Sequence, residues 1–160
     1  MDERLVMSSM STIQDFLAQD RVAVVGVSRE RKDFSRTLFQ EFCKHGYDAV
    51  AVNPQLTDID GVPCFAHLRD IKPPVDAAIL MTSPRVTEEV VHECAEAGIP
   101  RVWMYRAGGE GAVSEDAVRF CESHGMTVVP GECPLMFLQA SSWFHRAHGL
   151  IRKITGSYPK

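Results

Sequence analysis

The stretch that decides the fold is VAVVGVSRERKDFSR, residues 22–36. It begins with apolar, mostly β-branched residues typical of a buried strand, and Gly26 follows where a phosphate-binding turn usually starts. The two later glycines of the dinucleotide fingerprint G-x-G-x-x-G are replaced by Ser28 and Arg31. One glycine followed by several cations predicts a Rossmann-type first turn with an unusual ligand.

Strand-like and helix-like segments alternate along the rest of the chain. Strands are expected at about 22–27, 48–53, 77–81, 101–105 and 126–129, with helices at about 35–45, 84–97 and 115–124. Ser11 and Thr12 are expected to cap a helix before the first strand, Asp60-Gly61 predicts a turn, and a short helix is expected at 65–70. Strands that are apolar on both faces indicate a parallel sheet covered on both sides. We therefore expect an α/β fold: a single doubly wound Rossmann-like domain with a five-stranded, mainly parallel sheet and flanking helices.

Composition and charge limit the classes of partner and the location expected for the protein. The 160 residues carry a net charge of −4, so we expect no general attraction to nucleic acid or to an anionic membrane, and any anion site must be built locally. No apolar run approaches the roughly 20 residues of a membrane helix. The start MDERLVMSSM is unlike a secretory signal, which predicts a cytoplasmic protein. The 5 cysteines form no CxxC motif and are expected to be reduced and structural.

The end of the chain predicts a helical extension. Apolar residues recur along one helical face of the segment WFHRAHGLIRKI: Trp143, Ala147, Leu150, Ile151 and Ile154. We expect this face to pack on the body of the protein, on a second copy in a homodimer, or on a protein partner. A membrane-surface helix is a less favoured alternative.

The first turn is expected to bind phosphate. In doubly wound sheets ligands bind at the carboxyl ends of the strands, which is where Gly26 and Ser28 lie. Gly26 allows a tight turn, and Ser28 adds a hydroxyl donor. The loop that follows contains Arg29, Arg31 and Lys32, with Arg36 just beyond, so it concentrates positive charge in an acidic protein. The alternative is a charged loop that simply faces solvent.

The end of the second strand argues against NAD. An NAD site needs an Asp or Glu there to bind the ribose hydroxyls, whereas this chain has Asn53-Pro54-Gln55. Arg29, Arg31 or Arg36 would still suit the 2′-phosphate of NADP. An NADP-dependent oxidoreductase, or another nucleotide-binding enzyme, is therefore the alternative function.

The chain resembles the small stand-alone CoA-binding proteins of bacteria and archaea. Their Rossmann-like domain is similar to the amino-terminal domain of the succinyl-CoA synthetase alpha subunit. The resemblance rests on VAVVGVS, Ser35, GYDAVAVNP, IDGVPCFAHLRDI, PPVDAAIL, AGIPRVWM and GMTVVPGECP, together spanning about residues 12–137. It implies a CoA-binding domain at 11–137. The residues on either side predict a disordered or loosely ordered start at 1–10 and a helical extension at 138–160.

The resemblance also implies a site for CoA or an acyl-CoA at the carboxyl end of the sheet. It places the pyrophosphate near Gly26, Val27 and Ser28, phosphate oxygens near Arg29, Arg31, Ser35 and Arg36, and the adenosine near Asn53 and Pro54. It places a further wall at Thr82, Ser83 and Pro84, and the pantetheine path beside Trp103, Met104 and Tyr105. Two positions depart from the family. Members often have a basic residue where this chain has the neutral Gln55. Many members also have Gln and then a short Gly-containing turn after the tryptophan, where this chain continues with Met104.

No catalytic arrangement is evident in the sequence. There is no GxSxG elbow, His145 and His148 have no accompanying ligand cluster, and Cys133 with Glu132 in PGECP gives weak evidence for reactivity. We therefore expect a non-catalytic binding or regulatory module, with no metal and no enzymatic activity. A third hypothesis is an interaction protein that works through its terminal helix.

Overall fold

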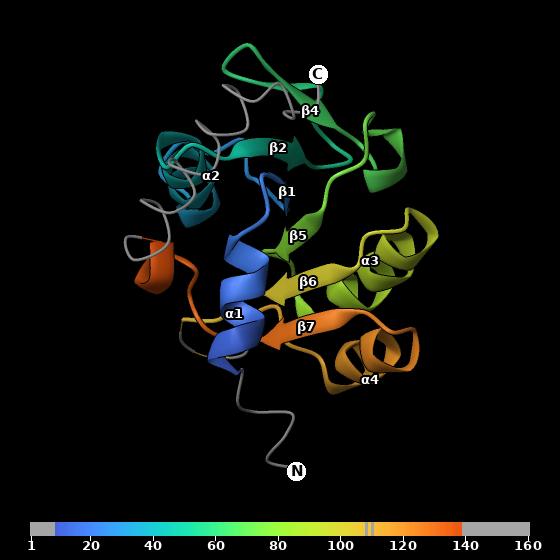
Figure 1. Cartoon of the computed structure of the whole chain (residues 1–160). Coiled ribbons are helices and arrows are strands. Elements are labelled where there is room, and N and C mark those ends of the chain that lie inside the picture. Colours follow the sequence, from blue (N-terminus) through green and yellow to red (C-terminus); the bar gives the residue numbers. More distant parts are fainter. Residues whose placement is uncertain (1–8, 108, 110, 139–160) are drawn as a thin grey trace, which may run out of the picture.

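A computed structural model of the chain describes residues 9–107, 109 and 111–138 (Figure 1). The strands are β1 (Arg21–Val25), β2 (Asp48–Val52), β3 (Asp58–Ile59), β4 (Val62–Phe65), β5 (Ala77–Leu80), β6 (Arg101–Met104) and β7 (Thr127–Pro130). The helices are α1 (Met10–Leu17), α2 (Phe34–Lys44), α3 (Pro84–Glu96) and α4 (Glu115–Ser123), with a 3₁₀ turn η2 (Leu68–Asp70). The expected alternation of strands and helices is confirmed.

The strands form one seven-stranded sheet in the order β3-β4-β2-β1-β5-β6-β7. All pairs are parallel except β3 with β4, which form an antiparallel hairpin at the edge. The prediction of five strands was therefore wrong, because it did not include the two strands of this hairpin. The turn between them is the predicted Asp60-Gly61. The expected helix at 65–70 is shorter, because Phe65 still belongs to β4 and η2 covers Leu68–Asp70.

The chain reverses its direction of travel across the sheet between β1 and β5. From β1 it moves outward to β2 and the hairpin, then returns to place β5 on the other side of β1. In such sheets the crevice outside the carboxyl ends of the strands at this switch point is the usual ligand position. The carboxyl ends of β1 and β5 therefore mark the mouth of the fold.

Helices cover both faces of the sheet, α1 and α2 on one face and α3 and α4 on the other (Figure 1). Alternate strand residues serve the two layers: Val24 and Ile79 pack toward α1 and α2, whereas Val25 and Leu80 pack toward α3 and α4. This two-sided burial explains why the strands lack a polar face.

Four N-cap side chains set the starts of the helices: Ser9, Asp33, Ser83 and Ser114. Ser83 and Ser114 directly precede the expected helices at 84–97 and 115–124, but Ser9 rather than Ser11 or Thr12 caps α1. Because α2, α3 and α4 each follow a parallel strand, their N-termini all lie at the carboxyl edge of the sheet. Their dipoles add positive potential at that edge.

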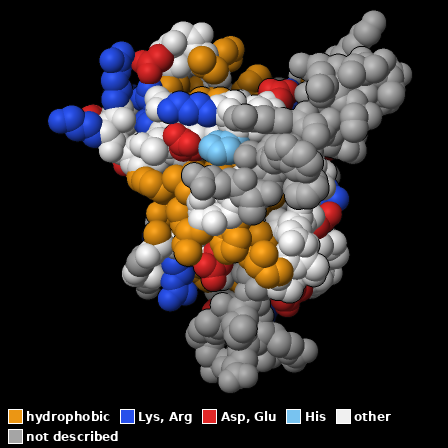
Figure 2. All heavy atoms as spheres, turned by 60° about the vertical axis from the view of Figure 1, so that its left-hand side comes forward, with side chains coloured by type: hydrophobic (Ala, Val, Ile, Leu, Met, Phe, Trp, Pro, Cys, Tyr) orange, Lys and Arg blue, Asp and Glu red, His pale blue; other side chains and the backbone are white. Residues whose placement is uncertain are grey.

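The side of the molecule that bears α1 and α2 shows hydrophobic side chains gathered at the surface (Figure 2). Met10 of α1 and Met136 after β7 are among the exposed large hydrophobic residues. In the part of the chain that the structure describes, no helix has the length and apolar character needed to cross a membrane. The expected terminal helix at 143–154 lies outside the described residues, as does most of the expected loose start at 1–10.

Candidate functional site

The turn after β1 depends on Gly26. Its φ of +95° lies in the left-handed region, and its amide donates to the carbonyl of Val52, 2.9 Å away. A Cβ at this position would lie 2.6 Å from the carbonyl oxygen of Met81, which follows β5. Gly26 therefore allows β1 to end in tight contact with the neighbouring chain segment, as expected of the first fingerprint glycine.

Internal hydrogen bonds use part of the turn that was expected to face a ligand. The amide of Ser28 donates to Ser35 Oγ at 2.9 Å, and Ser35 Oγ donates to Asp33 Oδ1 at 2.6 Å. Ser35 is buried, so it shapes the turn rather than facing the mouth. Among the hydrogen bonds of the described residues, the amides of Val27 and Arg29 have no acceptor. Of these two residues Val27 is fully buried and Arg29 is exposed, so the Arg29 amide is the one that the turn offers.

The hydroxyl of Ser28 is a second donor. Its oxygen accepts from the amide of Glu30 at 3.0 Å, and a serine hydroxyl can donate its hydrogen elsewhere at the same time. The expectation that Val27 meets the ligand is corrected, because the whole residue, backbone included, is 0% exposed. The turn therefore presents the Arg29 amide and the Ser28 hydroxyl.

Arg36 holds the loop in place from within. Its side chain is 4% exposed, and Nη1 donates to the carbonyls of Ser28 at 3.3 Å and Arg29 at 3.1 Å. Nη2 forms an ion pair with Asp60 at the tip of the β3–β4 hairpin, while the buried Nε has no partner. The expectation of a direct phosphate contact is thus replaced by a positioning role, which ties the loop to the hairpin.

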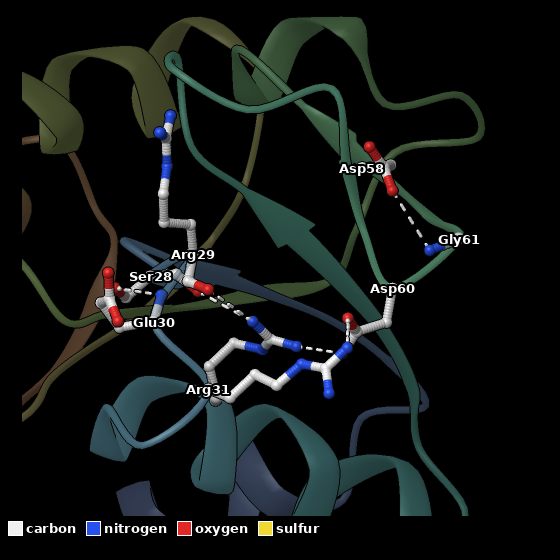
Figure 3. Close-up of polar contacts among 8 residues, drawn as sticks. Ser28, Arg29, Glu30, Arg31, Asp58, Asp60 and Gly61 are labelled. Carbon is white, nitrogen blue, oxygen red and sulfur yellow. Dashed lines mark hydrogen bonds and ion pairs between the residues drawn. The ribbon is translucent and has the colours of Figure 1, made fainter.

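The exposed cations of the loop differ in their pairing. Arg31 also pairs with Asp60, at 3.1 Å, with its side chain 81% exposed. Figure 3 shows the Arg29 side chain pointing away from Asp60. The ion pairs within the described ranges include neither Arg29 nor Lys32. A phosphate could therefore bind Arg29 or Lys32 without displacing a carboxylate from either side chain.

Asp60 lowers the positive charge that the sequence predicted for this loop. Its carboxylate serves both Arg36 and Arg31, and it sits in a left-handed conformation at φ +50°. Sequence reasoning missed Asp60 as a site residue, because it lies 24 residues from Arg36 and no local pattern links the two. The expected electropositive loop is thus partly neutralised, and backbone donors gain importance.

The end of β2 has no carboxylate, as expected, and Asn53 has a structural role there. Asn53 Nδ2 donates to the carbonyl of Val27 and Oδ1 accepts from the amide of Gln55, both at 2.9 Å. The side-chain amide therefore fixes the first turn against β2. Pro54 follows as an exposed residue, and its contact with adenosine stays a prediction.

The end of β5 supplies a wall made by the start of α3. Thr82 Oγ1 lies 2.6 Å from Thr87 Oγ1, and Ser83 caps the helix that Pro84 begins. Thr82 also approaches the first turn, since its Cγ2 would lie 3.4 Å from a Cβ on Gly26. The structure therefore brings Thr82, Ser83 and Pro84 to the same edge as Gly26, as expected.

At the end of β6, the expectation that three consecutive side chains border a ligand path is corrected. The side chains of Trp103 and Met104 are 0% exposed and pack into the two opposite core layers. The Trp103 indole meets Phe16 edge-on at 5.2 Å and donates to the carbonyl of Glu132 at 3.2 Å. Tyr105 alone of the three keeps an exposed portion.

Tyr105 and the loop after β7 meet at this end of the mouth. Burial, and to a smaller extent Cys133, raises the pKa of the Tyr105 hydroxyl. Glu132 adopts a left-handed φ of +67°, and its carbonyl accepts from the amide of Arg106 at 3.1 Å as well as from Trp103. Cys133 is half-buried there. The described residues contain no group of three or more His, Cys, Asp or Glu placed to hold a metal.

Comparison with known proteins agrees with this geometry. The sequence profile of the family described as CoA binding domain matches residues 20–139, which include every strand of the sheet and the whole mouth. The chain belongs to the CoA-binding domain family. The resemblance drawn from the sequence is thereby confirmed.

Individual relatives range from small proteins to large ligases. Bacillus subtilis YneT is 27% identical over 126 residues, covering 78% of this chain and 90% of YneT. Acetate–CoA ligase [ADP-forming] I of Archaeoglobus fulgidus is 29% identical over 118 residues, or 70% of this chain and 17% of the ligase. A solved structure from Pyrococcus furiosus is 27% identical with a TM-score of 0.66, covering 72% of this chain and 97% of that one.

Proposed function

We propose that this chain binds CoA or an acyl-CoA across the carboxyl edge of its sheet, as a binding or regulatory module that does not transform its ligand. The observation that supports this most strongly is the family match over residues 20–139, which contains the Gly26 turn at the switch point. CoA carries a pyrophosphate and a 3′-phosphate, so amide donors beside cations suit it chemically.

The donors suggest how the ligand lies. The pyrophosphate would meet the Arg29 amide, the Ser28 hydroxyl and the Arg29 guanidinium. The adenosine would lie toward Pro54 and the β3–β4 hairpin. Pantetheine would then extend in the opposite direction, past the end of β5 toward Tyr105.

The non-catalytic part of the proposal is supported by the bonding at the mouth. The hydroxyls of Ser83 and Thr87 serve helix capping and a side-chain pair, and the Ser35 hydroxyl is bonded to Asp33. None of the hydrogen bonds among the described mouth residues joins a hydroxyl or thiol to a histidine. The arrangement favours holding a ligand over attacking it.

Calorimetry with CoA, dephospho-CoA, NAD and NADP tests the binding proposal. We expect CoA to bind more tightly than dephospho-CoA, and neither NAD nor NADP to bind comparably. At 100 times the dissociation constant, a ligand should raise the free energy of unfolding by about 2.7 kcal/mol, which thermal shift would detect. Binding of NADP alone would favour the oxidoreductase alternative. Binding of no ligand would leave the interaction-protein hypothesis and contradict the proposal.

Turnover assays test the non-catalytic part. The protein is incubated with acetyl-CoA, with and without ADP and phosphate, and free CoA is measured by liquid chromatography, because a thiol reagent would also react with the free cysteines of the protein. We expect release at the rate of a protein-free control. Release that increases with protein concentration would show an enzyme.

A further inference from the structure

An aromatic pair stands at one side of the mouth, outside the phosphate-binding turn. Phe34 is the first residue of α2 and is 39% exposed, and Tyr105 directly follows β6. Their ring centroids are 5.5 Å apart, with 35° between the ring planes. The pair therefore joins the segment after β1 to the end of β6, across the end of β5.

Backbone contacts fix the position of both rings. Asp33 caps α2 at Phe34, and the adjacent Ser35 accepts the amide of Ser28 at 2.9 Å. Tyr105 donates its amide to Leu80 at 3.0 Å, and its carbonyl accepts from Ala112 at 2.7 Å. Both aromatic residues thus belong to the rigid frame of the mouth rather than to a loose surface segment.

The two sides of the mouth differ in chemistry. On the β2 side lie the Asp60 ion pairs and the polar Asn53. After β5 and β6, the partly buried hydrophobic residues Met81 and Tyr105 pack against the core layer under α1 and α2, as Leu56 does after β2. A ligand with an anionic end and an apolar end would therefore have one preferred orientation.

We propose that Phe34 and Tyr105 hold the acyl end of a CoA thioester, so that the preferred ligand is an acyl-CoA with an apolar acyl group. This inference rests on the proposed function, because it uses the same site. The partly exposed Phe34 ring gains from being covered, and each acyl methylene buried against it should tighten binding about fourfold. Free CoA ends at its thiol beyond the pantetheine, so it has no acyl methylenes to cover this ring.

Calorimetry with CoA, acetyl-CoA, butyryl-CoA and hexanoyl-CoA tests the inference on the full chain. We expect affinity to increase along this series. Phe34→Ala should lower hexanoyl-CoA affinity by about tenfold and change that of CoA by less than about twofold. Phe120→Ala is the matched control, because Phe120 lies in the second half of α4, away from the mouth, and packs on His92 and His124; it should have no effect on the series.

The outcomes separate the two proposals. If CoA binds but affinity is the same along the series, or Phe34→Ala weakens all four ligands equally, the acyl-end inference is overturned and CoA binding stands. If none of the four ligands binds, both proposals are overturned. Should Phe34→Ala lower the folded fraction, Phe34→Gln keeps a long helix-compatible side chain and gives the same comparison.

Discussion

At the end of β1, the backbone of Gly26 turns with φ +95° and passes close to the chain after β5. Two separate penalties therefore face any larger residue: the left-handed conformation and the 2.6 Å approach of a Cβ to the Met81 carbonyl. The amides after Gly26 keep their direction only while this contact is intact. Substitution of Gly26 therefore tests both the stability of the fold and the binding of CoA.

We expect Gly26→Ala to lower the free energy of unfolding by about 2–3 kcal/mol and to weaken CoA binding. Gly98→Ala is the matched control, since Gly98 also has positive φ (+74°) but its Cβ would meet nothing within 4 Å. The control should cost about 1 kcal/mol. Urea denaturation measures both, and equal losses would contradict the close-approach argument.

The Arg29 guanidinium provides a second test at this scale, because the ion pairs of the described residues leave it available to a phosphate. We expect Arg29→Glu to weaken CoA binding about tenfold, or 1.4 kcal/mol, with the loss shrinking at high salt. Lys72→Glu makes the same charge change on the segment leading into the amino end of β5, away from the mouth. Equal effects of the two substitutions in calorimetry would indicate a general charge effect and reject a phosphate contact at Arg29.

Trp103 shows that the local sequence pattern cannot determine whether a strand side chain packs in the core or contacts a ligand. The strand it belongs to is apolar on both faces, so the sequence correctly indicated a central parallel strand but could not assign each side chain to core or ligand. Its register opposite Ile79 and Val129 places the indole in the core layer under α1. That assignment depends on three-dimensional packing rather than on local sequence.

At the scale of elements, the β3–β4 hairpin is the main feature that sequence reasoning missed. Its strands contain 2 and 4 residues, and one includes Pro63, so neither gives a clear periodic signal. The turn itself was predicted, because Asp-Gly suits two consecutive residues with positive φ; the structure has +50° at Asp60 and +84° at Gly61. The hairpin matters because its tip binds Arg36 and Arg31.

Asp60→Asn removes the negative charge of this turn and should keep its backbone conformation. Asparagine tolerates the left-handed conformation, so the hairpin should form while its ion pairs with Arg36 and Arg31 are lost. We expect the free energy of unfolding to fall by about 1–3 kcal/mol, because a buried charged donor loses its acceptor. We also expect CoA to bind more tightly, since a carboxylate no longer competes with phosphate for the exposed Arg31. Thermal denaturation and calorimetry check the two effects, and weaker CoA binding would contradict this competition.

At the scale of the whole molecule, local patterns predicted the alternating elements, the parallel sheet and the position of the first turn. These follow from residue type and spacing within single segments. The Asp60 ion pairs and the Phe34–Tyr105 contact join residues 24 or more positions apart, and they arise from strand order and packing. The strand count and the inner bonding of the mouth therefore required the structure.

Two buried thiols should lower the free energy of unfolding at alkaline pH. Burial raises the pKa of Cys94, and it raises that of Cys121 to about 12. In the unfolded chain thiols ionise near pH 8.5, so below that pH both states keep their protons and stability is unaffected. As pH rises above about 8.5, the unfolded chain loses protons that the folded chain retains, so the free energy of unfolding falls.

We expect urea denaturation to show this fall between pH 8 and pH 10, at up to about 1.4 kcal/mol per pH unit for each thiol. A Cys94→Ala, Cys121→Ala double variant should show a shallower dependence on pH, whatever its stability at neutral pH. An unchanged slope would mean that these thiols ionise equally in both states.

A crystal structure of the chain with CoA tests the central claim most directly, because the claim concerns where one part of the ligand lies. We expect the pyrophosphate oxygens within hydrogen-bond distance of the Arg29 amide and the Ser28 hydroxyl, outside the carboxyl ends of β1 and β5. Density for CoA at another surface, or a first turn left empty at saturating CoA, would contradict the account.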